Sequence, residues 1–151
     1  MTAQQTSTHT WKFFQTGGLD QVLLRNGADI GHLAELDQKL WTALSCPTKG
    51  IRFDAKTLDL LDTDKDGRIR VPELLAAIAW TAARLISLDT LMDGSGTLRL
   101  ASLNAATPEG KALLANARRI LANLGKDSAD SISLANVADT AKIFANTRFN
   151  G

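Results

Sequence analysis

The chain has 151 residues, of which 44% are hydrophobic and 22% charged, and its net charge is +1. This length and composition predict one compact domain or two very small ones, and they exclude wholesale disorder and collagen-like structure. The near-neutral charge gives no electrostatic basis for binding nucleic acid or an anionic membrane, and one cysteine, Cys46, excludes an internal disulfide scaffold.

The two ends of the chain carry no targeting pattern. Residues 1–10 are polar, so we expect a flexible N-terminus and no secretory signal. The longest apolar stretch, residues 74–83, is too short to span a bilayer. We therefore expect a cytoplasmic protein with no membrane contact. The end at residues 146–151 has no capping signal, which favours a piece of a longer protein.

The first predicted elements are a β-hairpin and a helix. Two apolar runs within residues 11–28 are separated by Gly17 and Gly18, and glycines allow the positive backbone angles of a hairpin turn. A helix is then expected from an N-cap at Asp29 to about Ser45. Its apolar stripe repeats at helical spacing and comprises Leu33, Leu36, Leu40 and Leu44.

Two helices are expected on either side of a polar loop at residues 62–73. Asp54 is predicted to cap a short helix that carries Leu58 and Leu61. The helix after the loop spans residues 72–88, with Pro72 in its first turn, where the missing N–H costs nothing.

Two more helices are expected in the C-terminal part. Thr107 is predicted to cap a helix over residues 108–124, which Gly125 ends. Ser133 is predicted to cap a last helix over residues 134–144. Because the hairpin is the only sizeable β element expected, the sequence predicts a mainly α fold with short two-stranded β pieces.

The polar loop at residues 62–73 has the ligand spacing that a calcium ion requires. Ca²⁺ takes six to eight oxygen ligands, including carboxylates and backbone carbonyls. Gly67, at the sixth position, permits a sharp bend. The expected ligands are the carboxylates at loop positions one, three, five and twelve and the carbonyl at position seven, namely Asp62, Asp64, Asp66, Glu73 and Arg68.

This loop resembles the EF-hand family of calcium-binding proteins. The resemblance implies a helix–loop–helix fold and Ca²⁺ as the cofactor; the alternative is a solvated acidic loop without metal. Two departures predict a weak site. Arg70 occupies the ninth position, and Lys65, Arg68 and Arg70 dilute the charge of the four acids.

EF-hands normally occur in pairs, and weak copies of the motif surround the good loop. Apolar–polar–apolar triplets begin at Ile51, Ile69, Leu98 and Ile132, and they predict that the first pairs with the second and the third with the fourth. Residues 29–92 are thus expected to form one EF-hand-like pair with a single complete loop. Residues 93–151 are expected to form a degenerate second pair, truncated at the C-terminus.

The fourth copy aligns without gaps to the good loop. Leu61 matches Leu124, and Ile69 matches Ile132. The ligand positions held by Asp62, Asp66 and Glu73 are occupied in the fourth copy by Gly125, Ala129 and Asn136. Only Asp127 keeps a carboxylate in a ligand position, so this copy is expected to have kept its fold and lost its metal.

The wider chain resembles the N-terminal part of uncharacterised bacterial proteins that carry EF-hand loops. The stretches behind this resemblance are residues 9–14, 19–30 and 36–44. It implies further hands beyond residue 151, and it names no activity.

No residue pattern predicts an enzyme. His9 and His32 have no zinc-binding spacing, and Cys46 has no base beside it in sequence. We therefore expect no catalytic residues and no other cofactor.

The leading hypothesis is a calcium-binding module in which the ion is structural. A sensor groove rich in methionine is not expected, because the chain has only Met1 and Met92. The alternatives are a protein interaction module, docking through Trp80 or the aromatic hairpin, and a regulatory domain of a longer enzyme.

Overall fold

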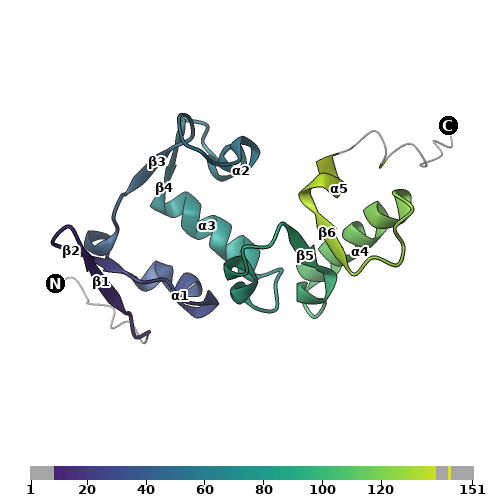
Figure 1. Ribbon diagram of the computed structural model, residues 1–151, viewed down its shortest axis with the longest axis horizontal. Helices are drawn as coiled ribbons and strands as arrows, with labels where there is room; N and C mark the ends of the chain where they lie inside the picture. Colours follow the sequence, from purple (N-terminus) through teal and green to yellow (C-terminus); the bar gives the residue numbers. More distant parts are fainter. Residues whose placement is uncertain (1–8, 139–142, 144–151) are drawn as a thin grey trace. The chain divides into compact units, whose positions relative to one another are not determined.

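Figure 1 shows the computed structural model, which describes residues 9–138 and 143. The chain forms two compact units that divide after Trp80. Within the described residues, no helix is both long enough and apolar enough to cross a membrane. The α-helices are α1 (Gly27–Gly31), α2 (Ala55–Leu61), α3 (Val71–Ala82), α4 (Pro108–Asn123) and α5 (Leu134–Ala138).

The prediction of a mainly α fold is wrong. Of the described residues, 46% are helical and 17% lie in strands, and three small antiparallel sheets stand beside five α-helices. The strands were underestimated because four of them have only three residues, too few to show an alternating pattern. Two helices are also short, since α1 has five residues and α2 has seven.

The hairpin expected within residues 11–28 is confirmed. Strand β1 (Phe13–Thr16) pairs antiparallel with β2 (Leu19–Val22), and Thr16 lies opposite Leu19. Gly17 and Gly18 form the turn with φ angles of 58° and 78°. Positive φ at both central positions is the requirement of a type I′ hairpin turn, and it explains why glycine occupies both.

The helix expected from Asp29 to Ser45 is not formed. Asn26, not Asp29, caps α1, and its side chain accepts a hydrogen bond from the Asp29 amide. The chain then makes two 3₁₀ turns, at Leu33–Glu35 and Gln38–Leu40. Leu36 is extended between them, and Leu44 is 55% exposed. The leucine spacing therefore reflects separate short turns, which bury Leu33 and Leu36 but not Leu44.

Asp29 is the centre of a buried polar cluster instead of a helix cap. Its carboxylate accepts hydrogen bonds from His9 Nε2 at 2.8 Å and from the Arg25 amide at 2.7 Å. The Arg25 guanidinium lies 3.3 Å from the same group. The His9 ring stacks on His32 and meets Trp11 edge-on. This cluster anchors the start of the described chain to α1.

The Asp29 cluster predicts a specific loss of stability in acid. The hydrogen bond from the Arg25 amide, aided by His9 and the Arg25 side chain, lowers the pKa of Asp29 from 3.8 to about 2. Because the folded pKa is depressed, the charged group stabilises the fold above pH 3.8, and this contribution is lost as the pH falls toward about 2.

Thermal melts of wild type and Asp29→Asn test this expectation. At neutral pH we expect the variant to melt about 5–10 °C lower, because its amide replaces a charged acceptor. The difference should shrink as the pH falls below 3.8. Asp20→Asn, in the exposed hairpin, is the control and should change little. A difference in melting temperature between wild type and Asp29→Asn that stays constant down to pH 2 would contradict the lowered pKa of Asp29.

The rest of unit 1 is a strand–helix–strand–helix arrangement. Strand β3 (Ser45–Pro47) pairs antiparallel with β4 (Arg68–Arg70), with Cys46 opposite Ile69. The expected pairing of Ile51 with the good loop is therefore wrong, because the partner strand ends before that triplet begins. Helix α2 is capped by Asp54, as expected, through a 2.8 Å hydrogen bond from the Thr57 amide.

Helix α3 is shorter than the expected 72–88 helix. It ends at Ala82, and Leu85 and Ile86 instead bond to a neighbouring segment: Leu85 bridges Leu103, and the Ile86 amide donates to Ser102 at 2.9 Å. These residues belong to unit 2. Leu85 and Ile86, which were expected at the end of the helix, therefore make their contacts outside it.

Unit 2 follows the predictions more closely. Thr107 caps α4 through its hydroxyl, and Gly125 follows the helix with a φ of 70°. Strand β5 (Thr97–Arg99) pairs with β6 (Ser131–Ser133), and the expected partners Leu98 and Ile132 lie opposite each other. The buried apolar cluster of this unit comprises Leu85, Leu100, Leu103, Ala117 and Leu121.

The last predicted helix, residues 134–144, is described only in part. Helix α5 begins at Leu134, and the Ser133 hydroxyl accepts a 3.3 Å hydrogen bond from the Asn136 amide, as expected of a cap. Residues 139–142 and 144–151 lie outside the described residues, as do residues 1–8 of the expected flexible N-terminus.

Candidate metal centre

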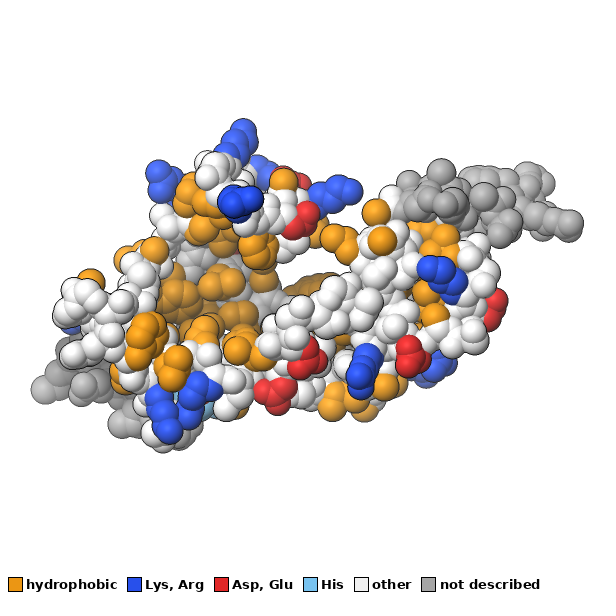
Figure 2. Space-filling model, in the orientation of Figure 1, with side chains coloured by type: hydrophobic (Ala, Val, Ile, Leu, Met, Phe, Trp, Pro, Cys, Tyr) orange, Lys and Arg blue, Asp and Glu red, His pale blue; other side chains and the backbone are white. Residues whose placement is uncertain are grey.

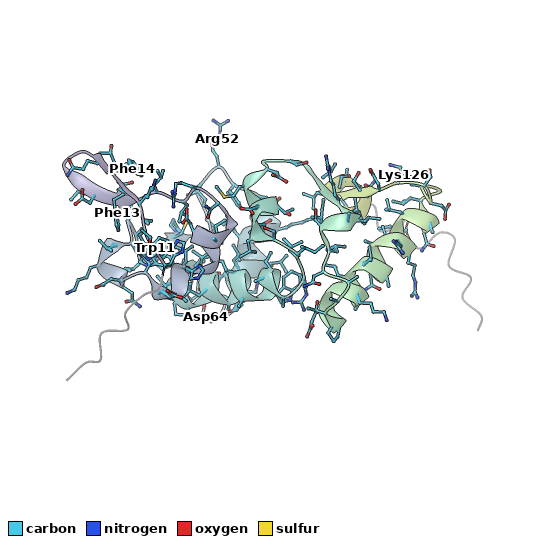
Figure 3. The ribbon with its side chains drawn as sticks, turned by 90° about the horizontal axis from the view of Figure 1, so that it is seen from below. Trp11, Phe13, Phe14, Arg52, Asp64 and Lys126 are labelled. Atoms are coloured by element: carbon cyan, nitrogen blue, oxygen red, sulfur yellow. The ribbon has the colours of Figure 1, made fainter. Side chains whose placement is uncertain are left out.

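The loop between α2 and α3 brings three carboxylates together. Oxygen atoms of Asp62, Asp64 and Asp66 all lie within 4.8 Å of one another (Asp64 is labelled in Figure 3). Asp62 is only 5% exposed, whereas the other two are exposed. Three negative groups at this separation repel one another unless positive charge or polarised N–H groups face them. The cluster therefore needs facing N–H groups or positive charge to be stable.

The backbone of the loop folds around these carboxylates. Asp62 accepts hydrogen bonds from the Asp66 amide at 3.2 Å and the Gly67 amide at 3.0 Å. The Asp66 carboxylate in turn accepts from the Arg68 amide at 2.9 Å. Gly67 has a φ of 85°, which a side chain disfavours. Short Asp side chains and one glycine thus suffice to close the turn.

Glu73 closes the loop from the first turn of α3. Its Oε1 accepts a 2.8 Å hydrogen bond from the Thr63 amide, and its Oε2 accepts one of the same length from the Arg70 amide. The bond from the Arg70 amide is the main reason why the pKa of Glu73 lies below its usual value. Glu73 is not part of the 4.8 Å group of aspartates. It instead links the second and ninth residues of the loop.

The strand pairing turns the Arg68 backbone toward the loop. The Thr48 amide donates to the Gly67 carbonyl at 3.0 Å, and Cys46 lies opposite Ile69. Hydrogen-bonded and non-bonded pairs alternate in an antiparallel ladder, so the Pro47–Arg68 pair between them is non-bonded. The Arg68 amide and carbonyl therefore face away from β3, as the bond from this amide to Asp66 confirms.

Arg70 is paired directly with the aspartates. Its guanidinium hydrogen-bonds Asp66 Oδ2 and lies 3.7 Å from Asp64 Oδ2. The bond to Asp66 is the main reason why the pKa of Arg70 is raised. The sequence predicted that Arg70 weakens the site, through its place at the ninth position and its charge, but not that it contacts the aspartates. Its spacing of four residues from Asp66 was the available signal, but strand geometry was needed to show the contact.

The other two basic residues of the loop make different contacts. The Arg68 guanidinium donates to the Ser45 hydroxyl of β3 at 3.2 Å. Lys65, at a φ of 60°, pairs with Asp59 of α2 at 2.9 Å. Neither of these interactions involves the aspartate group.

The second loop, residues 125–136, repeats several backbone hydrogen bonds of the first loop. Just as Arg70 donates its amide to Glu73, Ser133 donates its amide to Asn136 Oδ1 at 2.9 Å. The Leu100 amide donates to the Asp130 carbonyl at 2.8 Å, as Thr48 does to Gly67. The gapless alignment of the two loops therefore extends to their hydrogen bonds.

The second loop lacks the acidic group of the first. Asp127 is its only residue that matches one of the aspartates, because Gly125 and Ala129 replace the other two. Asn136 is one carbon shorter than Glu73, and the residue equivalent to Thr63, Lys126, donates its amide to Leu121 at 2.8 Å instead. The second loop therefore keeps part of the backbone arrangement but lacks the oxygen donors that Ca²⁺ requires.

An apolar cavity of about 270 Å³ lies in unit 1 beside the good loop. Figure 2 shows hydrophobic side chains gathered over this part of the surface. The lining comes from the 3₁₀ region, β3, α2, β4 and the start of α3, and includes Trp41, Leu44, Ile51, Phe53, Leu58, Ile69 and Leu74.

No family model, curated protein or solved structure matches this chain.

Proposed function

We propose that this chain is a non-catalytic calcium-binding module with one site, in the loop at residues 62–73. The observation that carries the proposal is the convergence of the Asp62, Asp64 and Asp66 carboxylates within 4.8 Å. The Arg68 carbonyl, on the loop side of β4, and the Glu73 carboxylate complete an all-oxygen donor set. Such a set suits a hard cation, and the ligand spacing is that of an EF-hand.

The role proposed for the ion is structural. It would neutralise the repelling aspartates and connect α2 to α3 through the loop. The hydrogen bonds from Thr63 and Arg70 to Glu73 support this role, because they already hold the two ends of the loop together. A cytoplasmic location is part of the same proposal.

Calorimetric titration with Ca²⁺ tests the proposal. We expect one site per chain with a Kd of about 10⁻⁶ to 10⁻⁴ M, on the weak side of the sensor range. Asp64→Asn removes a charged ligand of the good loop and should weaken binding about tenfold or more. Asp127→Asn changes the matching position of the second loop and is the control. Two sites per chain, or equal effects of the two variants, would contradict the proposal.

A second candidate function is protein–protein interaction through the hairpin. Phe13 and Phe14, which are labelled in Figure 3, lie on the hairpin. They are 45% and 42% exposed, and Leu19, on the paired strand, is 68% exposed. Exposed apolar residues gathered on one element are typical of contact surfaces. Sedimentation of wild type and of a Phe13→Ser, Phe14→Ser variant tests one form of this function. Self-association that the variant abolishes would support it.

A further inference from the structure

We propose that Arg70 is an internal cation that holds the aspartate group in the metal-free protein and competes with calcium for it. This inference rests on the calcium site proposed above. In this proposal, Arg70 regulates the site by lowering its affinity for calcium.

The position of the Arg70 side chain carries the proposal. One nitrogen of its guanidinium, Nη1, hydrogen-bonds Asp66 Oδ2 and lies 3.7 Å from Asp64 Oδ2. The same residue donates its backbone amide to Glu73 Oε2 at 2.8 Å. Arg70 thus contacts three of the four carboxylates expected to bind the ion. A guanidinium that faces these carboxylates repels a metal ion approaching the same oxygens, so the two cations compete.

The strand pairing of β4 keeps Arg70 next to these groups. Arg70 lies opposite Ser45 of β3, in a non-bonded pair like that of Arg68, so its amide faces the loop. Its side chain is partly exposed, which lets it leave for solvent when a stronger cation arrives. A doubly charged ion neutralises three aspartates better than one guanidinium does, so calcium wins the competition at sufficient concentration.

Arg68 provides an internal comparison, because it has the same charge and lies two residues away on the same strand. Its guanidinium contacts the Ser45 hydroxyl and makes none of the carboxylate contacts of Arg70. Replacing either arginine with Gln changes the net charge of the loop equally, and Arg68→Gln keeps the backbone carbonyl that is the proposed ligand. Only Arg70→Gln releases Asp66 and Asp64 from a direct ion pair. The difference between the two variants therefore isolates the competition.

Calorimetric titration of wild type, Arg70→Gln and Arg68→Gln with Ca²⁺ tests the proposal. Exposed ion pairs are weak, so we expect Arg70→Gln to bind about three- to tenfold more tightly than wild type. Arg68→Gln should gain less than about twofold, from long-range charge alone. Equal gains in the two variants, with a normal wild-type titration, would overturn the inference and leave the proposed function intact. A wild type that binds no Ca²⁺ at all would overturn both.

Thermal melts in chelator provide a second readout that needs no metal. Arg70→Gln leaves the aspartates facing one another without their counter-ion, so we expect it to melt about 2–4 °C below Arg68→Gln. The difference should shrink in saturating Ca²⁺, where the ion replaces the lost counter-ion and the tighter binding of Arg70→Gln offsets its lower metal-free stability. Melts in the opposite order in chelator would contradict an Arg70 that neutralises the metal-free loop.

Discussion

Replacing Glu73 with Gln should weaken calcium binding by about tenfold or more. The change removes one negative charge and one oxygen from the donor set. It also replaces an acceptor of the Arg70 or Thr63 amide with an NH₂ group, which cannot accept either bond. The loop therefore loses part of its closure as well as a ligand. Calorimetric titration of the purified variant measures the loss.

Glu109→Gln is the matched control for this variant. Glu109 is exposed and, like Glu73, lies in the first turn of a helix, but that helix is α4 of unit 2. We expect Glu109→Gln to bind calcium with the affinity of wild type. The metal-free Glu73→Gln protein should keep its fold, because the buried residues Leu58, Ile69 and Val71 do not depend on the carboxylate. Unchanged calcium affinity, or a collapsed metal-free fold, would contradict the role given to Glu73.

Calcium should stabilise the protein without opening a new apolar surface. An ion that binds only the native state adds about 2.7 kcal/mol at a hundredfold excess over Kd. For a unit of this size, that gain raises the melting temperature by about 10 °C or more. Melts with calcium and with chelator measure the shift. A magnesium titration at the same concentration is the control, since Mg²⁺ retains its waters and should stabilise less.

A hydrophobic dye distinguishes a structural ion from a sensor. The apolar cavity lined by Trp41, Phe53 and their neighbours is already present beside the loop, so some dye should bind in chelator. Because Glu73 already links the two ends of the loop, the ion is expected to tighten α2 against α3. Dye fluorescence should therefore stay level or fall when calcium is added. A clear rise would contradict the structural role and favour a sensor.

The elements that could be predicted were those fixed by local chemistry. Gly17 and Gly18 predicted the hairpin, since their positive φ angles are a property of the turn itself. Asp54 and Thr107 predicted the starts of α2 and α4 because a cap bonds to an amide three residues away. The convergence of the loop aspartates followed in the same way from spacing within one turn.

The predictions that failed concerned residues whose structure depends on partners distant in sequence. The leucines from Leu33 to Leu44 have helical spacing, but Asp29, which was expected to cap that helix, instead bonds to His9 twenty residues earlier. The three-residue strand β3 is formed by its pairing with β4 and shows no pattern of its own. The contact of Arg70 with Asp66 likewise depends on the strand that positions Arg70.

The central claim is that one calcium ion binds to the loop at residues 62–73 and none to the second loop. A crystal structure grown with calcium tests it most directly, through the anomalous difference map. We predict one peak, about 2.3–2.6 Å from oxygens of Asp62, Asp64, Asp66, the Arg68 carbonyl and Glu73. The Arg70 guanidinium should have left Asp66 in that structure. An empty first loop with calcium present, or a peak beside Asp127, would contradict the claim.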